Sequence, residues 1–134
     1  MAHQRGVGLV EVLMAVAMFV IASGGIVAAH LNSQGLADHA TDTLQAISHL
    51  EALMEHIYAT PFATLPTHFP DGVVNGGGAS DYAALVGGYT LEGEQIVVTY
   101  PSAATGRLEL LATVQWVHRN RPRTTSLSTV RTSG

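Results

Sequence analysis

A single carboxylate, Glu11, lies near the start of the most apolar stretch of the chain. From Val12 to Ala29 no charged residue follows it. An ionised carboxylate held in lipid costs on the order of a few kcal/mol, so an acid in such a position usually has a partner and a role. Glu11 is therefore the first candidate functional residue of this sequence.

The seven histidines are the second group that could do chemistry, as metal ligands or as acid–base groups. His49 and His56 are two helical turns apart, a spacing that does not bring two ligands together as a zinc site requires. We therefore predict that His39, His49 and His56 are solvated side chains of a helix, together with the neighbouring acids Glu51 and Glu55.

Four acids, Asp71, Asp81, Glu92 and Glu94, fall on predicted loops or strand ends. We interpret them as solvated side chains and not as pairs for acid–base chemistry. Calcium between Asp71 and Asp81 is disfavoured because the EF-hand spacing is missing. The stretch GVGLVE lacks the last glycine of a dinucleotide-binding loop and follows no strand. We predict no active site, no metal and no cofactor.

The charge of the chain is unevenly distributed. Between Asp38 and Glu109 there are nine acids and one base, Arg107, and no acid follows Glu109. This division is typical of a basic edge that meets an acidic partner, such as a neighbouring copy, or of a solvated hairpin turn. Arginines without interleaved aromatic residues make nucleic acid an improbable partner. The arginines after Glu109 are Arg119, Arg121, Arg123 and Arg131.

The N-terminal half is predicted to form one long helix. Residues 7–29 are numerous enough, at about 1.5 Å per residue, to cross a hydrocarbon core of roughly 30 Å. Residues 30–58 keep a helical pattern but become polar, and Pro61 ends the helix. Apolar residues at spacings of three and four define one stripe of this second part. The stripe consists of Ala40, Leu44, Ile47, Leu50, Met54 and Ile57.

Residues 59–134 are predicted to form a loop followed by a small antiparallel sheet, which makes the fold α+β. Prolines and the glycine-rich run from Asn75 to Asp81 break regular structure first. The predicted strands are 89–91, 95–100, 107–118 and 124–131, with a turn over 119–123. Alternation in the third strand predicts a buried face of Leu110, Ala112, Val114 and Trp116.

Three aromatic residues are candidates for contact with a ligand or surface. Trp116 lies on the alternating apolar face of its strand, so we predict a core position for it and not a ligand platform. Tyr82 and Tyr89 flank the glycine-rich loop, and we expect them to be exposed. If the chain contacts a surface or ligand, this loop is where variable contacts are expected.

The N-terminus admits three interpretations. A secretory signal peptide would use MAHQR as its basic region and be cut near Ala29. The long apolar run with an acid at its start argues against this. A plain single-pass anchor leaves Glu11 unexplained. The third interpretation comes from the order of residues in the segment RGVGLVEVLMAVAMFVI.

This segment resembles the N-terminal signature of the type IV pilin and type II secretion pseudopilin superfamily. By that resemblance residues 1–6, MAHQRG, are a prepilin leader, and the prepilin peptidase cuts between Gly6 and Val7. Glu11 is then the fifth residue of the mature chain, where the family has a glutamate. The chain departs from the family in starting with Val7 and Gly8, where phenylalanine or methionine and then a polar residue are usual.

The resemblance implies a role for each of these residues. Cleavage creates an α-amino group on Val7, with an ordinary pKa of about 8, and the family methylates this amine. Glu11 lies one helical turn further on, where an acid suits the helix N-terminus. In the family this carboxylate pairs with the N-terminal amine of a neighbouring subunit, so the resemblance implies an assembly role for Glu11.

The rest of the chain is similar to PilV-type minor pilins in its order of long helix, proline break, glycine-rich loop and terminal hairpin. That resemblance implies a pilin-like long helix packed on a small antiparallel sheet, in a subunit that initiates or modifies type IV pilus assembly. The implied partners are other pilin subunits, the prepilin peptidase and the bacterial inner membrane, with a periplasmic C-terminal domain before incorporation in the pilus.

Two alternatives stay open. A minor pseudopilin of the I type in a type II secretion system shares most of these features. A secreted binding domain with an ordinary signal peptide cut near Ala29 is the alternative from a different class. In none of the three do we expect an enzyme.

Overall fold

A computed structural model describes residues 8–77 and 81–133. The predicted cleavage site between Gly6 and Val7 lies outside the described residues. The chain divides between Asp38 and His39 into two compact units, and α1 (Leu9–Ala59) contributes to both. The second unit adds the 3-10 helix η1 (Phe62–Thr64), the short helices α2 (Leu65–His68) and α3 (Ala83–Val86), and three strands.

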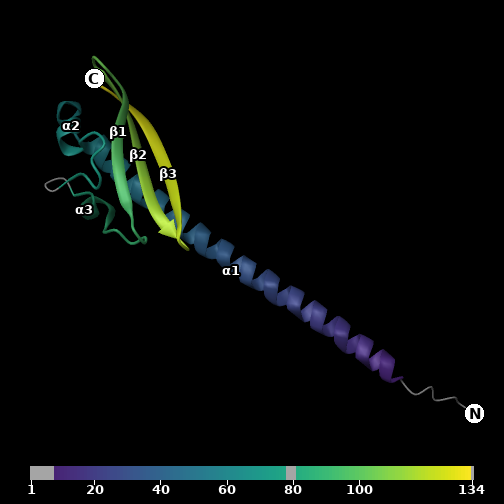
Figure 1. Ribbon diagram of the computed structural model, residues 1–134. Coiled ribbons are helices and arrows are strands. Elements are labelled where there is room, and N and C mark those ends of the chain that lie inside the picture. The colour runs from purple at the N-terminus through teal and green to yellow at the C-terminus, as the bar shows by residue number, and fades with distance from the viewer. Residues whose placement is uncertain (1–7, 78–80, 134) are drawn as a thin grey trace, which may run out of the picture. The chain divides into compact units, whose positions relative to one another are not determined.

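The strands form one antiparallel meander in the order β1-β2-β3 (Figure 1). They are β1 (Gln95–Ala104), β2 (Arg107–His118) and β3 (Arg121–Thr132). The α+β prediction is confirmed, and β2 has the predicted bounds. The predicted strand 95–100 continues beyond Tyr100, through a register shift between Thr99 and Ser102.

The predicted turn over 119–123 is wrong beyond Asn120. Arg119 and Asn120 both have positive φ, 50° and 59°, and form a two-residue turn between the paired residues His118 and Arg121. Turns of this length match the twist of the strands on either side. β3 therefore begins at Arg121, three residues before the predicted start, and includes Pro122.

The predicted strand 89–91 is also wrong. The backbone N–H groups of Thr90 and Leu91 both donate to the Glu94 carboxylate at 3.0 Å, which holds these residues in a turn. Gly87, with φ 81°, ends α3 just before them. The backbone groups that a strand would offer to a neighbour are here used by a side chain.

The helical stripe of the second unit is partly shifted from the predicted one. Leu50, Met54 and Ile57 are buried as predicted, but Ala40 is exposed and Leu44 is 68% exposed. At 3.6 residues per turn Ala40 and Leu44 lie on a different side of α1 from Ile57, so the predicted row does not stay on the side that faces the sheet. The row that does face the sheet runs through Ala46, His49, Leu50, Leu53, Met54 and Ile57.

The core of the second unit lies between this row and one face of the sheet, and α1 passes behind the sheet in Figure 1. The alternation predicted for β2 is confirmed, because Leu110, Ala112 and Val114 are fully buried and Trp116 is 3% exposed. The expectation for Tyr82 is wrong. Its side chain is fully buried, with its ring 5.8 Å from that of Phe69.

Three tyrosines of this unit hold their protons strongly. Burial raises the pKa of Tyr82 far above 10. Burial, with a hydrogen bond to Asp81, raises the pKa of Tyr89 to about 12. Burial, with the nearby charge of Asp71, raises the pKa of Tyr100 to about 12. The fold therefore favours the neutral phenol at all three positions.

We expect this to make the second unit sensitive to alkali. Between about pH 10 and pH 12 the unfolded chain has lost phenolic protons that the folded chain still binds, so stability falls as pH rises. Below pH 10 both states are protonated and the effect is absent. Phenolate absorbance should rise at a higher pH in the folded chain than in the chain unfolded by denaturant. Coincident titration curves would contradict the prediction.

The C-terminal end of α1 is capped from the last strand. The Arg131 guanidinium donates from Nη1 to the carbonyl oxygens of Ile57, at 3.1 Å, and Tyr58, at 2.7 Å. Its Nη2 donates to Thr60 O at 3.2 Å. The guanidinium carbon also lies 5.5 Å from the centre of the Tyr58 ring. A cation at this end complements the helix dipole and the carbonyls that have no helical partner. Arg131 is thus a structural residue and not part of a free basic edge.

Arg131→Ala is expected to lower the free energy of unfolding by about 1–3 kcal/mol, because carbonyl oxygens at the end of α1 lose a charged donor. Denaturant unfolding followed by Trp116 fluorescence measures this. Arg121→Ala is the matched control, since Arg121 is exposed and its loss should change stability by less than about 0.5 kcal/mol. Equal effects of the two substitutions would remove the capping role.

Candidate functional site

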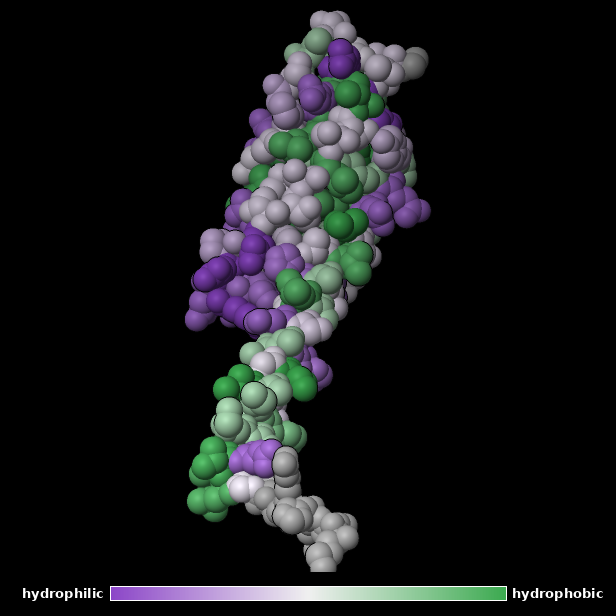
Figure 2. All heavy atoms as spheres, turned by 90° about the vertical axis from the view of Figure 1, so that its right-hand side faces the viewer, coloured by the Kyte–Doolittle hydropathy of each residue, from purple (hydrophilic) through white to green (hydrophobic). Residues whose placement is uncertain are grey.

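The N-terminal part of α1 has an apolar surface. Its large side chains are exposed, for example Leu9 at 79% and Ile21 at 75%. Figure 2 shows this part of the helix as a largely green, apolar surface next to the grey residues. The helix is long and apolar enough to cross a membrane, and none of its most apolar window is buried within the chain. Water disfavours such a surface, so the segment needs a lipid or protein environment.

Glu11 lies in the first turn of this helix and is exposed. Its backbone N–H donates to Gly8 O at 2.9 Å, which places Glu11 in the first turn of the helix. A negative side chain is favourable there because the N-terminus carries partial positive charge. The predicted processing positions, Gly6 and Val7, lie outside the described residues.

The second unit contains a buried pair that the sequence prediction missed. His49 Nδ1 and Glu94 Oε1 are 2.5 Å apart, and both residues are nearly fully buried. The predictions that His49 and Glu94 are solvated are therefore wrong. Since a carboxylate only accepts, Nδ1 of His49 carries the proton of this bond. With the Thr90 and Leu91 N–H groups, Glu94 has three donors, which is a stable setting for a buried carboxylate.

A second histidine pair lies where α1 meets the hairpin end of β2. His118 Nδ1 is 2.6 Å from Asp42 Oδ2, and the His118 ring lies 5.6 Å from that of His39. His39 Nδ1 lies 3.1 Å from the Thr43 hydroxyl. These contacts join α1 to the end of β2, and they account for the polar residues on this part of the helix.

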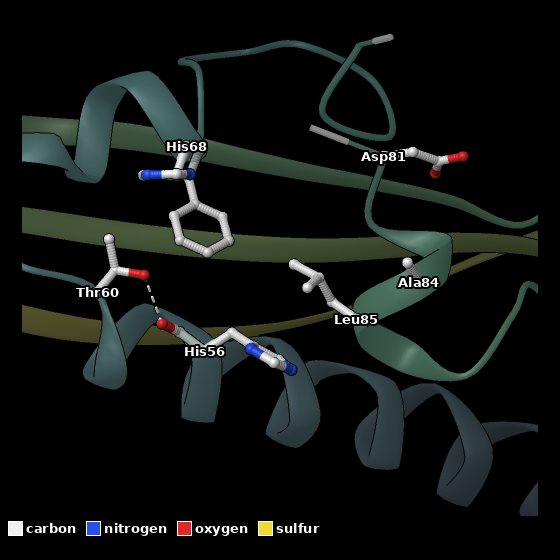
Figure 3. Close-up of a pocket in the computed structure, with 7 residues that line it drawn as sticks. His56, Thr60, His68, Asp81, Ala84 and Leu85 are labelled. Carbon is white, nitrogen blue, oxygen red and sulfur yellow. Dashed lines mark hydrogen bonds between the residues drawn. The ribbon is translucent and has the colours of Figure 1, made fainter. Parts of the chain in front are cut away.

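A pocket of about 370 Å³ opens beside the end of α1 (Figure 3). Three titratable residues line it, but His56, His68 and Asp81 do not point toward one another in the close-up. The Asp81 carboxylate accepts hydrogen bonds from the backbone of Ala83 and from the Tyr89 hydroxyl, both at 2.9 Å. The remaining lining residues are Thr60, Phe69, Ala84 and Leu85.

The other acids considered for chemistry are dispersed. Glu51, Glu55 and Glu92 are exposed, and Asp71 accepts a hydrogen bond from the backbone N–H of Tyr100 at 3.0 Å. Among residues 8–77 and 81–133, no group of three or more histidine, aspartate or glutamate side chains could hold a metal ion. The feature that stands out is thus the exposed apolar helix that carries Glu11.

Comparison of the sequence and structure with protein-family models, curated proteins and solved structures finds no match. The architecture itself, a long apolar N-terminal helix with a small antiparallel sheet, is like that of pilins.

Proposed function

We propose that this chain is a minor type IV pilin, a non-enzymatic structural subunit that initiates or modifies pilus assembly. One observation carries the proposal: an acid occupies the first turn of an exposed apolar helix that then continues unbroken to Ala59. A membrane anchor alone needs the apolar residues but has no use for Glu11, whereas assembly of apolar helices in lipid does.

In this proposal the precursor is seated in the bacterial inner membrane by α1, with its C-terminal unit in the periplasm. The prepilin peptidase cuts between Gly6 and Val7, and the new amine of Val7 is methylated. The Glu11 carboxylate then pairs with the N-terminal amine of a neighbouring pilin subunit. Two charges left unpaired in lipid are costly, so the pairing favours one register of the incoming helix.

Two other functions remain as alternatives. An I-type minor pseudopilin of a type II secretion system would use the same helix and the same glutamate, and co-purification with pilus tip subunits or with secretion pseudopilins distinguishes the two. A secreted binding domain would require a cut near Ala29. Such a cut would divide α1, which is helical on both sides of that residue.

The test is an intact mass and N-terminal sequence of the protein from native membranes. We expect a chain that begins at Val7 with one added methyl group. A chain that begins at Met1 would reduce the proposal to a simple anchor. A chain that begins near His30 would establish the signal-peptide alternative.

A further inference from the structure

The two edges of the sheet differ in whether other parts of the chain hydrogen-bond to their backbone groups. The outer edge of β1 is covered, because Gly72 N–H donates to Val98 O at 2.8 Å and Asn75 N–H donates to Ile96 O at 2.7 Å. The Asn75 side chain also accepts from Ile96 N–H at 2.7 Å. β3 is the other outermost strand (Figure 1), and within the described residues nothing pairs with its outer backbone groups.

The residues that form this free edge follow from the register. Pro122 lies directly opposite Val117, and because proline has no N–H it occupies a pair that is not hydrogen-bonded to β2. Such pairs alternate along an antiparallel ladder, and their backbone groups point away from the partner strand. The free edge is therefore made by Thr124, Ser126, Ser128 and Val130.

Two buried donors lie on the same strands without an acceptor. Trp116 and Arg123 are directly opposite each other in the β2–β3 register, so their side chains share one face. Trp116 Nε1 and Arg123 Nε are both buried, and neither has a hydrogen-bond partner among the described residues. An unpaired donor is costly, and because Arg123 is only partly buried, its guanidinium is the group of this pair that an acceptor from outside the chain can reach.

The charge of β3 restricts what that acceptor is. The strand carries Arg121, Arg123 and Arg131, and from Thr124 to Val130 it has no charge. β3 itself contains no Asp or Glu, so a second copy of this strand has no carboxylate to offer to Arg123. A carboxylate is the acceptor that a guanidinium binds most strongly.

We propose that the free edge of β3 binds an extended segment of a different protein, which adds a strand to the sheet and places a carboxylate against Arg123. Backbone hydrogen bonds to Ser126 and Ser128 supply the pairing, and the Arg123 guanidinium selects an acidic segment. This inference goes beyond the proposed function, because edge pairing requires neither Glu11 nor cleavage at Gly6.

The experiment uses the full chain in its native host with a photo-cross-linking amino acid in place of Ser126. Ser102, exposed on the other edge strand, is the matched control position. We expect the Ser126 adduct to map to an extended segment of another protein that contains Asp or Glu, and the Ser102 adduct not to do so.

Three second-site variants then test the contacts. Ser128→Pro removes an outward N–H without touching the β2 ladder and should abolish most of the adduct. Arg123→Gln should lower it about tenfold, as expected for loss of a charged hydrogen bond. Arg121→Gln removes the same charge from an exposed residue of β3 and should lower it little. Far-UV circular dichroism of each purified variant verifies that the fold is kept.

Three results would overturn the inference: an adduct with a second copy of this chain, a partner segment without an acid, or an adduct that survives both Ser128→Pro and Arg123→Gln in folded protein. The N-terminal sequence of the same samples tests the proposed function separately. A mature chain beginning at Val7 with no β3 adduct would therefore contradict edge pairing alone.

Discussion

Glu11→Ala is expected to leave membrane insertion intact and to lower incorporation into filaments about tenfold or more. Insertion depends on the exposed apolar surface of α1, which this substitution makes no less apolar. In the proposed function incorporation depends on the pairing of one carboxylate with one amine, and a charge left unpaired in lipid costs on the order of a few kcal/mol. The measurement is the ratio of this protein in sheared filaments to that in the inner membrane.

Two further variants make the prediction specific. Glu11→Gln keeps the shape of the side chain and removes its charge, so it should behave like Glu11→Ala. Glu51→Ala removes an exposed carboxylate further along the same helix and should incorporate normally. Normal incorporation of both Glu11 variants would remove the assembly role from this residue.

Glu94→Ala is expected to lower the free energy of unfolding by about 3–5 kcal/mol, because it leaves the buried His49 without its partner. It also leaves the N–H groups of Thr90 and Leu91 without an acceptor, so the turn before β1 loses the side-chain hydrogen bonds that hold it. Denaturant unfolding of the chain in detergent micelles, followed by Trp116 fluorescence, measures the loss.

Glu92→Ala is the matched control, since Glu92 is exposed in the same turn. This substitution should change the free energy of unfolding by less than about 0.5 kcal/mol. His49→Ala combined with Glu94→Ala gives the coupling between the two residues. The loss of unfolding free energy in the double variant should be smaller than the sum of the losses in the single variants. Each single change leaves the other buried group without its partner, and the double change does not. Additive losses, or a Glu94→Ala loss no greater than that of Glu92→Ala, would contradict the importance of the pair.

The elements that local pattern determines were predicted well. The period-two alternation of Leu110, Ala112, Val114 and Trp116 is a property of one segment, and it located β2 and its buried face correctly. The end of α1 before Pro61 is equally local. The start of β3 was misplaced because proline and arginine resemble turn residues, although an edge strand tolerates both.

The errors concern residues whose partners are distant in the sequence. His49 and Glu94 are 45 residues apart, and Arg131 caps carbonyls more than 70 residues away. No spacing rule brings such residues together before the fold is known. His49 did carry one clue, since it lies three residues after Ala46 and four before Leu53, on the row that faces the sheet. Glu11 was found by its motif, while the amine proposed to pair with it lies outside the described residues.

The cap that Arg131 provides at the end of α1 has a consequence for the order of events during synthesis. The apolar segment of α1 leaves the ribosome first, whereas the core beneath the helix needs β2, and the cap needs Arg131 of β3. Chains are made from the N-terminus at about 5–20 residues per second, so several seconds separate the two. The apolar segment is thus complete while the second unit is still unfolded, and the second unit closes only after Arg131 has been made.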